Sequence, residues 1–154
     1  MSQSYRLIIL EDEPQISKGL TGLSWVLAGV DLIKTFRTGE ELISEFSSIN
    51  PDIALCDINL PGLSGIETAR QIQSLKPELK VIFLTGYNDF QYAQSAVNLH
   101  AFAFILKPAD PDELINTVQK ARIAMEKDKA HYQHVHNLKK TIDDLSGTNP
   151  VLTI

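Results

Sequence analysis

A short apolar run that ends on an acidic residue is the feature that most constrains this sequence. Residues 53–56 (Ile-Ala-Leu-Cys) are four consecutive apolar positions, and Asp57 follows them directly. Such a run is typical of a strand that is buried on both faces of a parallel sheet. Because Pro61 and Gly62 then interrupt the chain, Asp57 is expected at the carboxyl end of a central strand, where open α/β sheets bind ligands. A single Asp at such a position is more often a simple turn residue, so the interpretation depends on the rest of the chain.

Strand-like runs alternate with helical patterns along the sequence. The runs occupy residues 5–10, 31–36, 53–57, 81–84 and 102–106. The capping or first-turn residues expected at the helix starts are Pro14, Thr38, Ser64, Asp89 and Asp110. No Asn-Gly hairpin signal lies between neighbouring runs. This alternation predicts an α/β fold, in which helices cover both faces of a five-stranded parallel sheet.

Two of these helices have well-defined sequence signals at their ends. The first is expected to run from Pro14 to about Ala28 and to end at Gly29. Its apolar stripe repeats at helical spacing and consists of Ile16, Leu20, Leu23 and Leu27. The second helix has a capping box, with Thr38 as the N-cap and Glu41 three residues later.

Polar residues follow four of the predicted strands. Glu11 and Asp12 come after the first, Asp57 ends the third, Thr85 follows the fourth and Lys107 follows the fifth. In a parallel sheet these strand ends share one edge. Three carboxylates packed together remain ionised only when a cation neutralises them, and hard oxygen ligands of this kind suit Mg²⁺. A hydroxyl and an ammonium group beside them complete a site that can handle phosphoryl oxygens.

Composition narrows the class of protein. With 154 residues, 44% hydrophobic and 21% charged, the chain is long enough for one globular domain with a good core. Its net charge of −5 argues against nucleic-acid binding by electrostatics alone. No apolar run is long enough to span a bilayer and no signal peptide precedes the first strand, so we expect no membrane association. The single cysteine, Cys56, lies in an apolar run, which indicates an inert buried thiol and a cytoplasmic location.

Four segments together carry a resemblance to a known family. They are residues 9–14 (Ile-Leu-Glu-Asp-Glu-Pro), 57–65 (Asp-Ile-Asn-Leu-Pro-Gly-Leu-Ser-Gly), 84–86 (Leu-Thr-Gly) and 106–108 (Leu-Lys-Pro). Residues 5–123 resemble the response-regulator receiver domain of two-component phosphorelays. The resemblance implies a flavodoxin-like fold with strand order 2-1-3-4-5. It also implies a phosphorylation-dependent switch rather than an enzyme, with a histidine kinase or phosphotransfer protein as its partner.

The resemblance also assigns metal-binding roles. Asp57 would be the phospho-acceptor, Asp12 would coordinate Mg²⁺ directly and the backbone carbonyl of Asn59 would be a further ligand. Glu11 would act nearer the outer coordination sphere. Many receivers have Asp where this chain has Glu11, so we expect that metal binding is retained with altered geometry.

Three further residues receive roles by resemblance. Thr85 would hydrogen-bond the phosphoryl group, and Lys107 would pair with it through a position fixed by a cis bond to Pro108. Phe104 would be the aromatic switch residue, where Tyr is common in the family. An ordinary half-buried strand aromatic is an equally good interpretation of Phe104.

Residues 86–93 (Gly-Tyr-Asn-Asp-Phe-Gln-Tyr-Ala) resemble receivers that precede an AraC-type DNA-binding domain. Such a domain needs on the order of 100 further residues, and the sequence ends at Ile154. DNA would therefore be bound only through an output domain that this chain lacks. The alternative is a stand-alone receiver that acts by protein–protein contact or phosphate shuttling. An aspartyl-phosphate hydrolase is disfavoured, because Asn59 stands where such enzymes need a second acid.

Residues 112–145 contain no Gly or Pro, which predicts one long helix from Asp112 to about Leu145. Val135, Leu138, Ile142 and Leu145 follow spacings of three, four and three residues, which is compatible with a short coiled coil. We expect residues 124–145 to be a helical extension, either a dimer linker or a packed or frayed tail, and residues 146–154 to be flexible. A homodimer would use the fourth helix, fifth strand, fifth helix and this extension.

Three histidines in this segment, His131, His134 and His136, are interpreted as solvated side chains. Only the first two lie one helical turn apart, and no thiol or carboxylate completes a metal site at the usual spacing.

Overall fold

The computed structural model describes residues 4–86, 89 and 100–148. The chain divides into two compact units between Arg122 and Ile123, and each is described by itself. The helix expected after Asp89 lies, apart from that residue, outside the described part of the chain.

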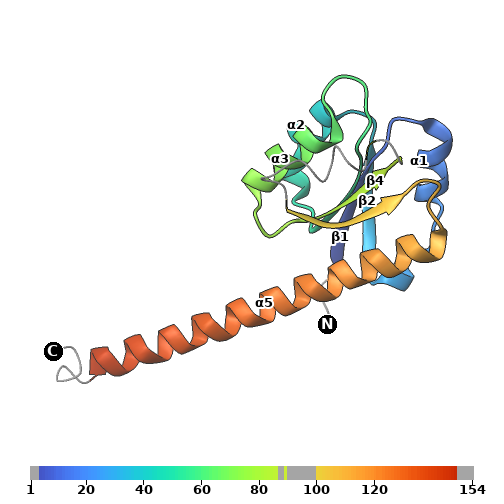
Figure 1. Cartoon of the computed structure of the whole chain (residues 1–154). Helices are drawn as coiled ribbons and strands as arrows, with labels where there is room; N and C mark the ends of the chain where they lie inside the picture. The colour runs from blue at the N-terminus through green and yellow to red at the C-terminus, as the bar shows by residue number, and fades with distance from the viewer. Residues whose placement is uncertain (1–3, 87–88, 90–99, 149–154) are drawn as a thin grey trace. The chain divides into compact units, whose positions relative to one another are not determined.

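The first unit is built on a parallel sheet (Figure 1). Its strands are β1 (Tyr5–Leu10), β2 (Val30–Phe36), β3 (Ile53–Asp57), β4 (Lys80–Thr85) and β5 (Ala101–Leu106). They are hydrogen-bonded in the order β2-β1-β3-β4-β5, and every neighbouring pair is parallel. The prediction of a flavodoxin-like sheet is therefore confirmed, and the carboxyl ends of β1, β3 and β4 lie side by side.

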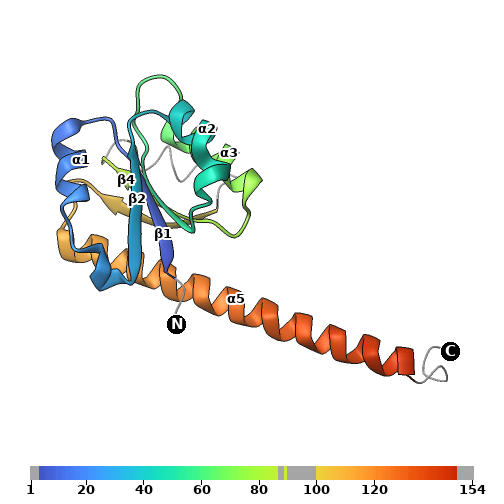
Figure 2. The same cartoon turned by 180° about the vertical axis from the view of Figure 1, so that it is seen from behind.

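Helices cover both faces of this sheet, as the two opposite views show (Figures 1 and 2). The helical segments are α1 (Pro14–Thr21), the 3₁₀ helix η1 (Trp25–Ala28), α2 (Gly39–Ile49), α3 (Gly65–Leu75) and α5 (Pro111–Thr148). Between the sheet and α2 and α3 lies a core of buried side chains that includes Leu10, Phe36, Phe46, Cys56, Ile72 and Phe83. Alternate strand residues such as Leu7, Ile9, Leu55 and Ile82 are also buried and point to the opposite face.

The predicted capping residues of two helices are confirmed. The Thr38 hydroxyl accepts a hydrogen bond from the Glu41 backbone N–H at 3.2 Å, at the start of α2. The Ser64 hydroxyl accepts one from the Glu67 N–H at 3.1 Å, at the start of α3. Ser64 thus fixes where α3 begins, directly after the loop that leaves β3.

The predicted extent of the first helix is wrong. α1 ends at Thr21, and η1 follows after a short break. The Leu20 carbonyl accepts the Leu23 backbone N–H at 3.2 Å, in the tightened pattern of a helix end, and also the buried Trp25 indole N–H at 2.9 Å. Leu27 is 68% exposed instead of belonging to the buried stripe. Gly29 does end a helix, but that helix is η1, and its φ of 78° is left-handed.

The long helix α5 continues three residues beyond the predicted end at Leu145. In the first unit its side chains Leu114, Val118 and Ala121 are buried. In the second unit Met125 is buried. Five large apolar side chains further along the helix are exposed: Tyr132, Val135, Leu138, Ile142 and Leu145. Among the described residues, no helix combines the length and apolar character that a bilayer crossing requires.

Candidate functional site

Three acidic side chains meet at the carboxyl edge of the sheet. Glu11 and Asp12 follow β1, and Asp57 is the last residue of β3. Glu11 is fully buried, Asp57 is 3% exposed and Asp12 is partly exposed. One carboxylate oxygen from each lies within 4.8 Å of the others. The juxtaposition expected from parallel strand ends is therefore present.

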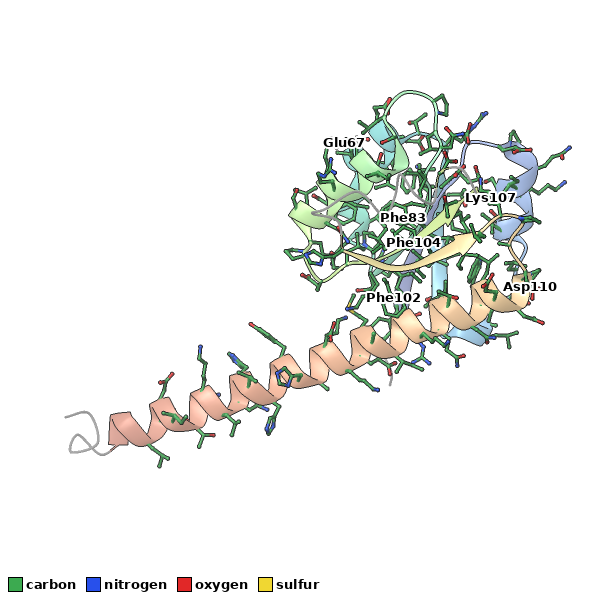
Figure 3. The ribbon with its side chains drawn as sticks, viewed as in Figure 1. Glu67, Phe83, Phe102, Phe104, Lys107 and Asp110 are labelled. Atoms are coloured by element: carbon green, nitrogen blue, oxygen red, sulfur yellow. The ribbon has the colours of Figure 1, made fainter. Side chains whose placement is uncertain are left out.

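The ammonium group of Lys107 joins two of these acids. Its Nζ lies 2.9 Å from Asp57 Oδ2 and 3.3 Å from Glu11 Oε1. Burial lowers the pKa of Lys107, but the hydrogen bond and charge of Asp57, together with Glu11, outweigh burial and raise it. The Lys107 backbone N–H donates to the Thr85 carbonyl at 2.9 Å, which holds the end of β5 beside β4. Figure 3 shows Lys107 at this end of β5, and its bond to Pro108 is cis as expected.

Crowding of the acids changes the proton affinity of Glu11. Burial raises the pKa of its carboxyl from 4.5 to about 7, and the hydrogen bond and negative charge of Asp57 add to this effect. Lys107 acts in the opposite direction, but its charge is shared with Asp57. Three carboxyl groups thus cluster around the ammonium group of Lys107, and a further cation would favour their ionised forms.

The loop after Asp57 is tied closely to the strand that it leaves. The Asn59 N–H donates to Asp57 Oδ1 at 3.2 Å, and the Gly65 N–H donates to the Ile58 carbonyl at 3.0 Å. A Cβ atom on Gly65 would lie 1.8 Å from the backbone oxygen of Asp57. Only glycine therefore allows α3 to begin this close to β3.

Thr85 and Phe104 lie on the neighbouring strands. Thr85 is fully buried, and its hydroxyl donates to the Gly86 carbonyl at 3.0 Å. Phe104 is partly buried and stacks on Phe83 with ring centroids 5.6 Å apart. Figure 3 labels both residues. The structure places Thr85 at the edge that carries Asp57, while Phe104 lies further back along β5.

An open cleft of about 560 Å³ gives access to the acids. Its described lining consists of Asp12, Glu13, Pro14, Asp57, Asn59, Gly86, Asp89 and Lys107. Sequence reasoning assigned Asp89 only to a helix start and missed its place on the cleft. Its position four residues after Thr85, on the same sheet edge, is the signal that could have identified it.

Comparison with known proteins agrees with this geometry. A family model, the response regulator receiver domain, matches residues 7–119. The YesN protein of Bacillus subtilis, described as an uncharacterized transcriptional regulatory protein, is 25% identical over 142 residues, which cover 92% of this chain and 39% of YesN. The DNA-binding transcriptional regulator NtrC of Salmonella typhimurium is 37% identical over 106 residues, covering 66% of this chain and 23% of NtrC. The chain thus spans less than half the length of these relatives.

Solved structures agree as well. The receiver domain of AraT, a response regulator from Geobacillus stearothermophilus, has a TM-score of 0.77 at 26% identity. A two-component transcriptional regulator AraC from Clostridium phytofermentans has a TM-score of 0.77 at 28% identity. Each match covers 82% of this chain and 99% of the other. The chain belongs to the response regulator receiver domain family, whose members are regulatory, phospho-accepting domains.

Proposed function

We propose that Asp57 accepts a phosphoryl group from a histidine kinase or phosphotransfer protein in the cytoplasm. The observation that carries this proposal is the contact of 2.9 Å between the Lys107 ammonium and Asp57, in a cleft that is open to solvent. An Asp57 oxygen attacks phosphorus, the bond from phosphorus to the histidine nitrogen breaks, and the imidazole leaves with the electron pair. Lys107 then pairs with the phosphoryl oxygens. The chain itself promotes this transfer and the later hydrolysis of the acyl phosphate.

The acidic cluster has the donor set that Mg²⁺ prefers. Glu11, Asp12, Asp57 and the Asn59 backbone carbonyl would hold the ion, because the three carboxylates already converge within 4.8 Å. A bound Mg²⁺ would offset the repulsion between the phosphoryl group and the acids. Among the chain's own groups, the Asn59 N–H orients one Asp57 oxygen and Lys107 orients the other.

Loss of Asp12 is expected to weaken Mg²⁺ binding more than loss of Glu11. Asp12 is partly exposed on the cleft, whereas Glu11 is buried, contacts Lys107 and has a pKa of about 7. Glu11→Gln should therefore cost on the order of 10-fold in affinity, as for an outer partner, and Asp12→Asn should cost more. Calorimetric Mg²⁺ titrations of both variants measure the two effects. A larger loss for Glu11→Gln would reverse the assigned roles.

Phosphorylation would be communicated through Thr85 and Phe104. A phosphoryl oxygen offers the Thr85 hydroxyl a stronger acceptor than the Gly86 carbonyl that it contacts in this structure. Movement of Thr85 toward Asp57 would leave space beside β5, into which Phe104 can rotate. The phosphoryl group would thereby shift a pre-existing equilibrium between two conformations.

We propose that this shift favours binding of a second copy of the chain. The two copies would contact one another through the surface of β5 and α5 and through the extension of α5 (residues 124–145). Val135, Leu138, Ile142 and Leu145 are 41–60% exposed at near-heptad spacing. Burying the exposed half of these eight side chains in a dimer would contribute roughly 8 kcal/mol. Association itself costs about 4–15 kcal/mol. Burial of these four apolar residues in each copy is therefore only marginally sufficient for a stable dimer. A modest change at the surface of β5 and α5 can then decide whether the dimer forms.

Phosphorylation is accordingly expected to tighten self-association about 5- to 150-fold, the usual range of coupling between two sites. Sedimentation over a concentration series, with and without a fluoroberyllate mimic of the phosphoryl group, measures this change. Thr85→Ala should accept phosphate on Asp57 yet show a smaller shift. A dimer constant that does not respond to the mimic would eliminate this dimerisation mechanism while leaving the phospho-acceptor assignment intact.

The relatives named above are transcriptional regulators, and they are longer than this chain. We propose that the switch controls a DNA-binding output, carried by a segment that follows α5. A stand-alone receiver acting by protein contact is the alternative. The coding sequence after codon 154 distinguishes the two, because an immediate stop codon would eliminate a covalently attached output domain.

A further inference from the structure

Asp89 is a charged residue of the cleft to which the proposed chemistry gives no role. It belongs to the Gly86–Ala93 motif, and it lines the cleft together with Asp57 and Lys107. Its N–H donates to the Gly86 carbonyl at 3.1 Å. A Cβ atom on Gly86 would lie 3.6 Å from Asp89 Oδ2, so the carboxylate lies beside the backbone that follows Thr85.

The described lining of the cleft is strongly unbalanced in charge. It contains four acids, Asp12, Glu13, Asp57 and Asp89, and Lys107 is the single cation among these described residues. The ammonium of Lys107 is already shared by Asp57 and the buried Glu11. Even with a divalent cation bound, an incoming anion meets acids that the metal does not coordinate. Of the acids in this described lining, Asp89 is the one that follows β4 along the chain.

We propose that Asp89 selects between phosphodonors by their charge. This inference rests on the proposed function, since it assumes that Asp57 is the acceptor. The Asp89 carboxylate disfavours small dianionic acyl phosphates more than N–P donors whose nitrogen-containing group can carry a proton and so lower the net charge, such as phosphoramidate and phosphohistidine. The switch is thereby partly insulated from free acyl phosphates and responds preferentially to its protein partner.

The two donor classes undergo the same displacement with different leaving groups. With acetyl phosphate, an Asp57 oxygen bonds to phosphorus, the bond to the acyl oxygen breaks and acetate leaves with the electron pair. With phosphoramidate, the P–N bond breaks and ammonia leaves with the protons already on nitrogen. Because the acceptor chemistry is common to both, a difference in their response to Asp89 reports on approach and binding.

Removal of one negative charge near the mouth of a cleft raises the rate at which an anion approaches. The size of the increase depends on the charge of the anion and on the salt concentration. Asp89→Asn is expected to raise the rate of Asp57 phosphorylation by acetyl phosphate about 3- to 10-fold at low ionic strength. The increase with phosphoramidate, a net monoanion, should be clearly smaller. Both increases should shrink as salt is added.

A set of variants separates charge from local structure. Asn and Ser are good N-cap residues without charge, whereas Ala is a poor cap. Charge selection predicts the same increase for Asp89→Asn, Asp89→Ser and Asp89→Ala, while a purely structural role predicts that only Asp89→Ala differs. Glu78→Gln removes the same charge from an exposed position that precedes β4, at the opposite edge of the sheet, and should leave both rates unchanged.

Initial rates of phosphorylation by the two donors, measured by intact mass at two salt concentrations, decide the question. A higher acetyl phosphate to phosphoramidate rate ratio in Asp89→Asn, reduced by salt, supports the proposal. Equal changes with both donors, or no change, would overturn it while leaving Asp57 as the acceptor. If neither donor phosphorylates the wild-type chain, the proposed function itself fails.

Discussion

Replacement of Asp57 with asparagine is expected to abolish phosphorylation of the chain. The wild-type protein, given Mg²⁺ and a small phosphodonor, should gain the mass of one phosphoryl group, and Asp57→Asn should gain none. The amide keeps the shape of the side chain but removes the anionic oxygen that attacks phosphorus. It also removes the ionic contact with Lys107 at 2.9 Å.

The variant should remain folded, because it removes one of three crowded acids and leaves Lys107 paired with Glu11. A thermal unfolding experiment serves as the control for this. Equal labelling of wild type and Asp57→Asn would show that another residue is the acceptor, and proteolytic mapping would then locate it.

Substitution of Gly65 by alanine is expected to destabilise the first unit by about 3 kcal/mol or more. The new Cβ atom would lie 1.8 Å from the Asp57 backbone oxygen and 2.9 Å from the Ile58 Cα, and neither is a flexible side chain that can move aside. Either α3 must shift or β3 must bend, and overpacking of this kind costs about 1–3 kcal/mol even where side chains can adjust. Phosphorylation should decline as well, because the loop that positions Asp57 begins here.

Gly19→Ala is the matched control for this substitution. Gly19 lies inside α1, and a Cβ atom there would meet nothing within 4 Å. Alanine at an open helix position should stabilise the protein by up to about 1 kcal/mol. Chemical denaturation of both variants measures the two changes, and a Gly65→Ala protein as stable as Gly19→Ala would contradict the packing argument.

The strand ends illustrate what could be predicted from the sequence. Asp57 and Glu11 were placed at one sheet edge because consecutive parallel strands must end there, whatever the details of the loops. The caps Thr38 and Ser64 were also predictable, since each depends on hydrogen bonds within three residues. Local signals and strand direction together therefore specify most of the fold and the acidic cluster.

Features that depend on tertiary contacts were not predictable in the same way. Periodicity extends the first helix too far, because it does not represent the hydrogen bonds that the Leu23 N–H and the Trp25 indole make to the Leu20 carbonyl where α1 ends. Asp89 was interpreted as a helix cap, because no repeat pattern indicates which loop residues face a cleft. The bond from Thr85 to Gly86 likewise depends on one rotamer in the finished fold.

The burial of Cys56 has a practical consequence for experiments on this chain. It is the only cysteine in the sequence, it is fully buried on β3, and burial raises its pKa to about 12. Because the thiolate is the reactive form, thiol reagents should label the native protein very slowly. A cysteine introduced at an exposed position, such as Leu138→Cys in α5, would then be the one thiol available for a spectroscopic label or an intermolecular cross-link. Proximity between two copies can therefore be recorded in an otherwise unaltered protein, before and after a phosphodonor is added.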